Sequence, residues 1–268
     1  MSLQSAAVVN EYLPAYRPAK PRLLSSDTSW YYFPHIFQAQ LALTSTQKQR
    51  VFQLRHKVYC EEMGFEPLRV DGLETDRYDD RSLHASITHV ASGKLAGTVR
   101  IISSDNQLEL LPIEQHFSDQ ITHAELAPEN FSRQHICEIS RLAVPEEIRC
   151  RSSIVQTGQS EVENACCKMV AISLYLQVIN MCLRTGRIHA YVMIEPALAR
   201  VLRRIGIHFI QIGNPIDFNG LRAPYYLDIR TTATTLKPEY RKLRDILEAQ
   251  LYNRQESNKP QMALCYSA

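Results

Sequence analysis

The chain has 268 residues, of which 45% are hydrophobic and 22% charged, and its formal net charge is +2. This length suits one large α/β domain with terminal extensions, and the composition is ordinary for a globular protein. The charge balance gives no overall attraction to nucleic acid or to membranes, so a basic partner site has to be a local patch. We therefore expect no nucleic-acid partner.

The seven cysteines form no C-x-x-C pair, and their number is odd. This usage predicts neither a disulfide framework nor a structural metal site, and it indicates a reducing compartment. The N-terminal residues lack a basic segment followed by an apolar one, so we expect no signal peptide and a cytoplasmic location. The longest apolar run, near 169–183, is interrupted by Gln177 and Asn180 and is too polar to span a bilayer.

The first half of the chain predicts a strand, a helix and a hairpin. Residues 1–30 contain several prolines and no sustained period, which is typical of a poorly ordered arm. Thr44 and the residues after it (45–47) form a pattern that caps the start of a helix, and Gly64 ends that predicted helix. The expected elements are a strand (37–44), a helix (46–62), an acidic loop (70–82), strands 82–90 and 95–103, and a loop with short helical pieces (108–134).

The second half predicts a strand–helix–strand crossover followed by further strands. The expected elements are a strand (135–144), a long helix (159–185) capped by Gly186, a strand (188–195), a short helix (196–206), strands 207–213 and 223–230, and a charged helix (237–252). This order predicts an α/β fold of the α+β type, with a mixed, mostly antiparallel central sheet flanked by helices. We expect one domain over 31–235, then a C-terminal helix and tail over 236–268. That helix is either a solvated cover over the core or a dimer or carrier contact.

The helix over 46–62 carries two competing sets of candidate residues. His56 and Cys60 are four residues apart, a spacing compatible with a nucleophilic dyad, but no third orienting group is evident. Arg55 and Tyr59 share a face at the same spacing and would line a binding pocket instead.

The loop over 70–82 places Asp76 and Asp79 close together and near other carboxylates. Its spacing is not that of a calcium loop. It is either a solvated acidic loop or a patch that binds an amine and accepts its proton. Arg100 lies on an apolar strand and needs acidic partners, which this loop can supply as a structural pair or as part of a site.

The strand over 135–144 contains Glu138 and Arg141, two charges in an apolar segment. In a regular strand they point to opposite faces, and a β-bulge would re-aim one of them. The segment after this strand offers Arg149, Arg151 and Ser152. These residues either contact a phosphate-bearing donor or its acidic carrier protein, or belong to a plain polar loop.

Four motifs, R-H-K-V-Y-x-E-E-x-G-F, E-T-D-x-Y-D-D, G-T-V-R and E-I-S-R-L-A-V, occur in this order over roughly 37–230. Together they resemble the branch of the GNAT superfamily that holds the N-acyl amino acid synthases and the acyl-homoserine-lactone autoinducer synthases. The nearest resemblance is to the acyltransferases of bacterial PEP-CTERM/exosortase systems. The phosphate-binding loop of other GNAT proteins is degenerate here, which disfavours a plain acetyl-CoA enzyme.

The resemblance implies transfer of a long acyl chain to an amine by direct attack. Its donor would be an acyl-carrier protein or acyl-CoA thioester, with no bound cofactor and no metal. It implies catalytic roles for Glu138, Asp76 and Arg100, and the favoured general base is Glu138 or an Asp acting through water. It implies substrate contacts for Arg55, Asp79 and Arg141. We also expect Tyr59, on the same helix face as Arg55, to contact substrate, and Val144 to line the acyl chain.

Two departures from the autoinducer synthases bear on the acceptor. Phe65 stands where those enzymes tend to have Trp, and both terminal extensions are longer. Both departures favour an amino acid over S-adenosylmethionine as the acceptor amine. The alternatives are a lactone-forming autoinducer synthase and a non-catalytic module that binds acyl chains or a carrier protein. A lipid product would also allow a peripheral membrane contact.

Overall fold

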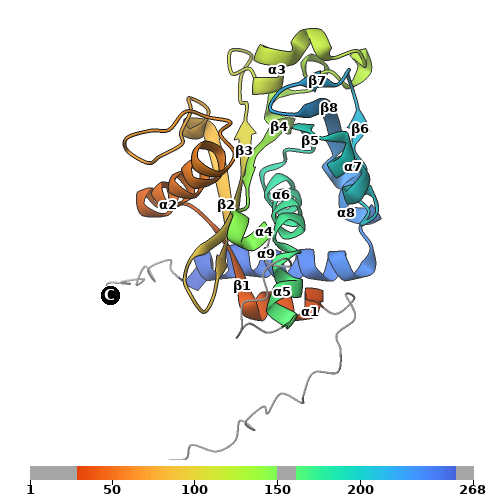
Figure 1. The fold of residues 1–268 in the computed structure, drawn as a ribbon. Coiled ribbons are helices and arrows are strands. Elements are labelled where there is room, and N and C mark those ends of the chain that lie inside the picture. Colours follow the sequence, from red (N-terminus) through yellow and green to blue (C-terminus); the bar gives the residue numbers. More distant parts are fainter. Residues whose placement is uncertain (1–28, 150–160, 258–268) are drawn as a thin grey trace, which may run out of the picture.

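The structure is a computed structural model that describes residues 29–149 and 161–257. Within these ranges the strands form an eight-stranded sheet in the order β1-β2-β3-β4-β5-β8-β6, with β7 beside β8 (Figure 1). Only β4 and β5 run parallel among the neighbouring pairs. The strands are β1 (Phe37–Leu41), β2 (Ser82–His89), β3 (Leu95–Ser103), β4 (Ile136–Ala143), β5 (His189–Ile194), β6 (Ile210–Gln211), β7 (Ile216–Asp217) and β8 (Leu221–Asp228). The predicted mixed, mostly antiparallel sheet flanked by helices is confirmed.

The helices agree with the sequence pattern in most places. They are α1 (Ser29–Ile36), α2 (Ser45–His56), the π-helical η2 (Lys57–Glu62), η3 (Asp79–Arg81), α3 (Pro112–Phe117), η4 (Ser118–Gln120), η5 (Ala124–Leu126), η6 (Pro128–Asn130), η7 (Arg133–His135), α4 (Glu146–Arg149), α5 (Glu161–Cys167), α6 (Val170–Thr185), α7 (Pro196–Arg203), α8 (Ile229–Thr235) and α9 (Pro238–Ser257). Neither α1 nor α8 was expected. The strand predicted over 207–213 is reduced to the two residues of β6.

The long helix expected over 159–185 is two helices, α5 and α6, bent by 50°. The bend follows a local change in hydrogen bonding, because the N–H of Met169 donates to the carbonyl of Cys166, three residues back. Gly186 ends α6 in the left-handed region, with φ of 70°, as the sequence predicts. In the described ranges no single helix is long and apolar enough to cross a bilayer, and the bent pair α5 and α6 meets that test only by length and composition.

Helices cover both faces of the central strands. α6 packs against β2, β3 and β4, while α2 packs against the same strands from the other side (Figure 1). Alternation along β3 sorts its side chains accordingly, since Val99 and Ile101 enter the main core with α6 and Arg100 points the other way. Gly97 permits the close approach of α6, because a Cβ there would lie 3.0 Å from Leu174.

The sheet opens between β4 and β5. Their parallel pairing runs only from Ile136 to Ile139 on β4, although that strand continues to Ala143. On its other side β4 contains a bulge, because Ser140 pairs with Arg100 whereas Ala143 pairs with Thr98. The two irregularities leave the second half of β4 free to line a site.

The C-terminal helix α9 packs against α6, β1 and α1. Its side chains Leu243, Leu247 and Leu251 are buried in the main core. The interpretation of this helix as a cover over the core is therefore confirmed for its buried face. Most of the predicted N-terminal arm (1–28) and the end of the predicted tail (258–268) lie outside the described residues, and the domain boundaries stay predictions.

Candidate functional site

The first wall of the site comes from α2 and η2. Thr44 begins α2 with a capping box, in which its hydroxyl accepts the N–H of Gln47 and the Gln47 side chain accepts the N–H of Thr44. Seven residues after Thr44 the helix is already against the sheet, with Val51 buried. The chain then widens into the π-helical turn of η2, a feature that often accompanies functional sites. This wall presents Arg55 to Glu74 and Asp79 of the acidic loop and Tyr59 to Leu142 of β4.

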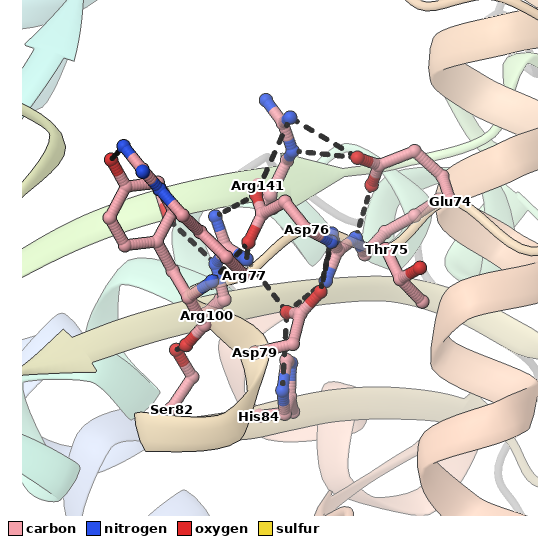
Figure 2. A network of polar contacts seen from close by, with 12 residues as sticks. Glu74, Thr75, Asp76, Arg77, Asp79, Ser82, His84, Arg100 and Arg141 are labelled. Carbon is pink, nitrogen blue, oxygen red and sulfur yellow. Dashed lines mark hydrogen bonds and ion pairs between the residues drawn. The ribbon is translucent and has the colours of Figure 1, made fainter. Parts of the chain in front are cut away.

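Arginine and carboxylate side chains form a continuous ion network beside this wall (Figure 2). Arg55 is fully buried, with Nε 2.5 Å from Oε2 of Glu74 and Nη1 2.7 Å from Oδ1 of Asp79. Arg100 binds Asp76 with two bonds, Nη1–Oδ1 of 2.6 Å and Nη2–Oδ2 of 2.9 Å. Its Nη1 also lies 2.7 Å from Oδ1 of Asp79, so that Asp79 joins the two arginines.

The network fixes the charge of its members. Burial alone would raise the pKa of Asp79, but hydrogen bonds and charge from Arg55, with the charge of Arg100, lower it to about 2. The pKa of Asp76 is lowered in the same way: burial opposes ionisation, and the bonds to Arg100 outweigh it. Both carboxylates are therefore ionised at neutral pH and are poor proton acceptors. They are suited to hold a cation.

Arg141 joins the network because of the β4 bulge. It adopts a φ of +48°, an unusual conformation for a residue with a side chain, and this turns it off the regular strand face. Its Nη2 lies 2.8 Å from Oε1 of Glu66 and 3.1 Å from Oε1 of Glu74, and its guanidinium lies over the ring of Tyr59 at 5.4 Å. Arg141 and Glu138 consequently line one cavity, as the sequence predicted for a bulged strand.

Glu138 is separate from the ion network. It is 4% exposed, its Oε2 accepts the N–H of Ile113 at 2.7 Å, and within the described residues it makes no ion pair. Burial raises its pKa to about 8, although the Ile113 hydrogen bond and the charge of Arg100 oppose the shift. A carboxyl group with this proton affinity is suited to exchange a proton near neutral pH. The sequence motif does not reveal Ile113 as its partner.

Ile113 is held in place by an anchor at the start of α3. Glu114, next to it, accepts the N–H of Leu111 through Oε2 at 2.7 Å. The same carboxylate receives both ends of the Arg133 guanidinium, at 2.6 Å and 2.8 Å. The N–H that reaches Glu138 is thus fixed by an ion pair outside the cavity.

The structure excludes the Cys60–His56 dyad. Both ring nitrogens of His56 are occupied, since Nδ1 lies 3.0 Å from Oε1 of Glu61 and Nε2 accepts the N–H of Arg69 at 3.1 Å. Burial, and then the charge of Glu74, raises the pKa of the Cys60 thiol, which is the opposite of what an activated nucleophile needs. Cys60 is a packing residue.

Two cavities meet at the opened part of β4. The first, of about 220 Å³, is lined by charged side chains that include Asp76, Arg100 and Glu138. The second, of about 210 Å³, is mainly apolar, with Leu142, Val192 and Leu198 among its lining residues. The two share a wall made of Tyr59, Ile139, Ser140, Arg141, Met193 and Arg222. The hydroxyl of Tyr59 donates to the carbonyl of Leu142 at 2.8 Å and braces this wall.

Some predicted site residues are elsewhere. Val144 is buried in the main core and lines neither cavity, because the bulge puts Leu142 in the place expected for it. Arg149 is exposed on α4 and binds Glu62 with an Nη2–Oε2 distance of 2.7 Å, away from both cavities. Arg151 and Ser152 lie outside the described residues.

Residues outside the motifs also line the site. His116 reaches the charged cavity, and Arg222 reaches both cavities from β8. The start of β8 is distant in the sequence from every motif, so no local spacing could have linked it to them. The described ranges contain no group of three or more His, Cys, Asp or Glu side chains that could hold a metal ion.

Comparisons with known proteins point to one kind of fold. Residues 54–159 match the profile described as the acetyltransferase (GNAT) domain. A comparison with curated protein sequences finds no match. Among solved structures, the acyl-homoserine-lactone (AHL) synthase LasI superposes with a TM-score of 0.55 at 16% identity, covering 75% of this chain and 94% of LasI.

Two further solved structures have the same architecture. BjaI, described as a CoA-dependent acyl-homoserine lactone synthase and solved with SAM and isopentyl-CoA, gives a TM-score of 0.55 at 19% identity, covering 79% of this chain and 89% of BjaI. FeeM, an N-acyl amino acid synthase from uncultured soil microbes, gives 0.50 at 15% identity, covering 75% and 94%. Residues 54–159 thus resemble the acetyltransferase (GNAT) domain, and the chain shares its fold with LasI, BjaI and FeeM.

Proposed function

We propose that this protein is an N-acyltransferase that moves a long acyl chain from a thioester donor to the amine of an amino acid. The observation that carries the proposal is the shared wall between a charged cavity and an apolar one. An amine acceptor in the first and an acyl chain in the second would bring the two reacting groups together at Ser140 to Leu142. The GNAT match and the fold support the same reaction class.

Proton removal is the first chemical requirement. An acceptor amine is protonated at neutral pH and cannot attack until a base takes a proton. Glu138 lines the cavity, has no competing ion pair within the described residues, and has a pKa of about 8. Asp76 is fixed as an anion by Arg100 and would hold the ammonium ion before transfer.

The acyl transfer then proceeds by direct attack. The amine nitrogen forms a bond to the thioester carbonyl carbon, the C–S bond breaks, and the proton held by Glu138 passes to the leaving thiolate. The freed Glu138 carboxylate then takes the second proton from the new amide nitrogen and releases it to solvent. A backbone N–H in the unpaired part of β4, near Leu142, would stabilise the oxyanion. No acyl-enzyme is formed, in keeping with the unreactive environment of Cys60.

The donor in this proposal is an acyl-carrier protein or acyl-CoA in the cytoplasm. Arg149 is exposed, and together with Arg151 and Ser152 it belongs to a basic and polar segment that suits an acidic carrier protein or a pantetheine phosphate. The order of the four sequence motifs supports a place among the acyltransferases of PEP-CTERM/exosortase systems.

An acyl-homoserine-lactone synthase is the second candidate, because the folds of LasI and BjaI match this chain with TM-scores of 0.55. Phe65, in place of the Trp typical of that group, argues against it. One experiment separates the two. Purified protein is given acyl-CoA and acyl-carrier protein with chains of different length, together with either the twenty amino acids or S-adenosylmethionine. Mass spectrometry should detect N-acyl amino acids. Lactones alone would establish the second candidate, and the absence of any acylated amine would reject both.

A further inference from the structure

Arg222 differs from the arginines of the ion network. Arg55, Arg100 and Arg141 each bind at least two carboxylates. Arg222 lines both cavities and is half-buried, yet it makes no ion pair with any residue in the described ranges. Its Nε is buried and has no hydrogen-bond partner there. A buried donor without a partner is rare and calls for an explanation, such as a ligand.

The position of the Arg222 guanidinium is fixed from two sides. Its backbone pairs with Ile216 of β7, which anchors the start of β8. Its guanidinium lies 5.8 Å from the centre of the Phe65 ring, within the range of a cation–π contact. The cation is thus presented at the shared wall, in a set position, with its Nε–H unpaired among the residues that the structure describes.

The charged cavity has the pattern of charge that a zwitterion needs. The network contains three guanidinium groups, from Arg55, Arg100 and Arg141, against four carboxylates, from Glu66, Glu74, Asp76 and Asp79. Its surplus is negative and attracts an ammonium group. Arg222 provides the opposite charge at another part of the same cavity, where it attracts an anion.

The thioester donor offers no anion at this place. Near the reacting carbon it consists of an apolar chain, a carbonyl group and the uncharged amides of pantetheine. Its phosphate lies at the far end of the pantetheine arm. A carboxylate on the acceptor is the anionic group that would accompany an amine into the cavity.

We infer that Arg222 binds the carboxylate of the acceptor and so selects amino acids over amines that lack this group. The inference rests on the proposed function for the transfer step, and its binding part can be tested without turnover. Arg222 would donate two hydrogen bonds to the carboxylate, one of them from Nε. The amine would then lie toward Asp76 and Glu138.

The kinetic test compares each amino acid with its carboxamide, which keeps the amine and the side chain but removes the negative charge. The variants are Arg222→Met, Arg222→Lys and, as a control, Arg203→Met on the exposed side of α7. Arg222→Met should raise KM for the amino acid roughly 10- to 100-fold and leave KM for the carboxamide unchanged. Arg222→Lys should restore part of the difference. Equal effects on both acceptors would overturn the inference.

The binding test uses thermal shift with the same amino acids and carboxamides and requires no donor. The wild-type protein and Arg203→Met should be stabilised by an amino acid but not by its carboxamide, and Arg222→Met should lose this response. Binding of this kind without any turnover would uphold the role of Arg222 and reject the proposed acyl transfer. If wild type and Arg222→Met both acylate the carboxamides as well as they acylate the amino acids, acyl transfer is upheld and the role of Arg222 is rejected. The absence of both binding and turnover would reject both proposals.

Discussion

The Oε2 atom of Glu138 accepts the N–H of Ile113 at 2.7 Å, while the nearby guanidinium of Arg100 is directed to Asp76, Asp79 and Ser140 instead. This arrangement separates two kinds of carboxylate at and beside one cavity. Asp76 and Asp79 are kept ionised by arginines, whereas Glu138 is buried with no ion-pair partner among the described residues, and its pKa rises to about 8. The first kind suits ammonium binding, and the second suits proton transfer.

The rate of transfer should rise with pH as Glu138 loses its proton. Because burial raises the pKa of Glu138 to about 8, the basic form accumulates between about pH 7 and pH 9. We expect kcat to increase over this interval and then level off. Initial rates measured from pH 6 to pH 10 with a saturating acceptor would show this, and a flat profile would contradict the assignment of the base.

Glu138→Gln should lower kcat by about 10²- to 10⁴-fold, because the amide cannot accept the proton. Glu125→Gln, at an exposed position, serves as the control and should have no effect.

Glu138→Gln should also change the pH dependence of stability. The folded protein keeps the Glu138 proton from about pH 4.5 up to pH 8 while the unfolded chain loses it, so wild-type stability should fall over that range. The variant should lack this part of the slope in urea unfolding, and an unchanged slope would contradict the raised pKa.

Asp79→Asn should destabilise the protein by about 3–5 kcal/mol, because it leaves two buried arginines without part of their counter-charge. The adjacent Asp80→Asn is a matched control, since Asp80 is exposed. The pKa of Asp79 is lowered to about 2, so its contribution is complete above about pH 4 and is lost as the pH falls toward 2. Urea unfolding at neutral and acid pH measures both effects. Equal free energies of unfolding for the two variants would show that the network does not stabilise the fold.

Cys60→Ser should leave kcat and KM close to their wild-type values. The thiol is buried, its pKa is raised, and His56 is engaged by Glu61 and Arg69. Loss of a true nucleophile lowers turnover by orders of magnitude. Steady-state kinetics with a long-chain donor, together with intact-protein mass spectrometry for an acylated enzyme, would reveal a cysteine mechanism.

Leu198→Trp should shorten the acyl chain that the protein prefers. Leu198 lines the apolar cavity from α7, and a larger side chain there would fill part of its 210 Å³. Val201→Trp lies on the same helix but at an exposed position, so it should not alter the preference. Competition between donors of different chain length, read by mass spectrometry, gives the ratio directly. An unchanged ratio for Leu198→Trp would place the chain elsewhere.

Sequence reasoning was partly right where function depends on local spacing. Tyr59 lines both cavities as predicted, whereas Arg55, four residues before it, is fully buried in the ion network and lines neither cavity. The E-x-S-R strand predicted that Glu138 and Arg141 would need a bulge to act together, and the structure contains it. The sheet and its flanking helices also followed from the order of periodic segments.

Sequence reasoning failed where partners come from distant segments or where a side chain competes with backbone preference. Arg222 and Ile113 belong to a strand and a short helix that carry no motif, and only the folded chain brings them to Glu138 and its cavity. Residues 229–235 are rich in threonine, which favours a strand, but they form α8. Asp228 explains the difference, because its carboxylate accepts the N–H groups of Arg230 and Thr231 and starts a helix there.

The anchor between Glu114 and Arg133 separates the control of acidity from the control of specificity. It fixes the N–H of Ile113 on Glu138 from outside the cavity, so substitutions at Glu114 and Arg133, which line neither cavity, would shift the pH optimum without changing which chain or acceptor fits. Relatives of this protein that work at different pH could therefore keep identical cavity residues and differ only in this ion pair. Exchanging the pair between two such proteins would transfer the pH optimum and leave the product unchanged.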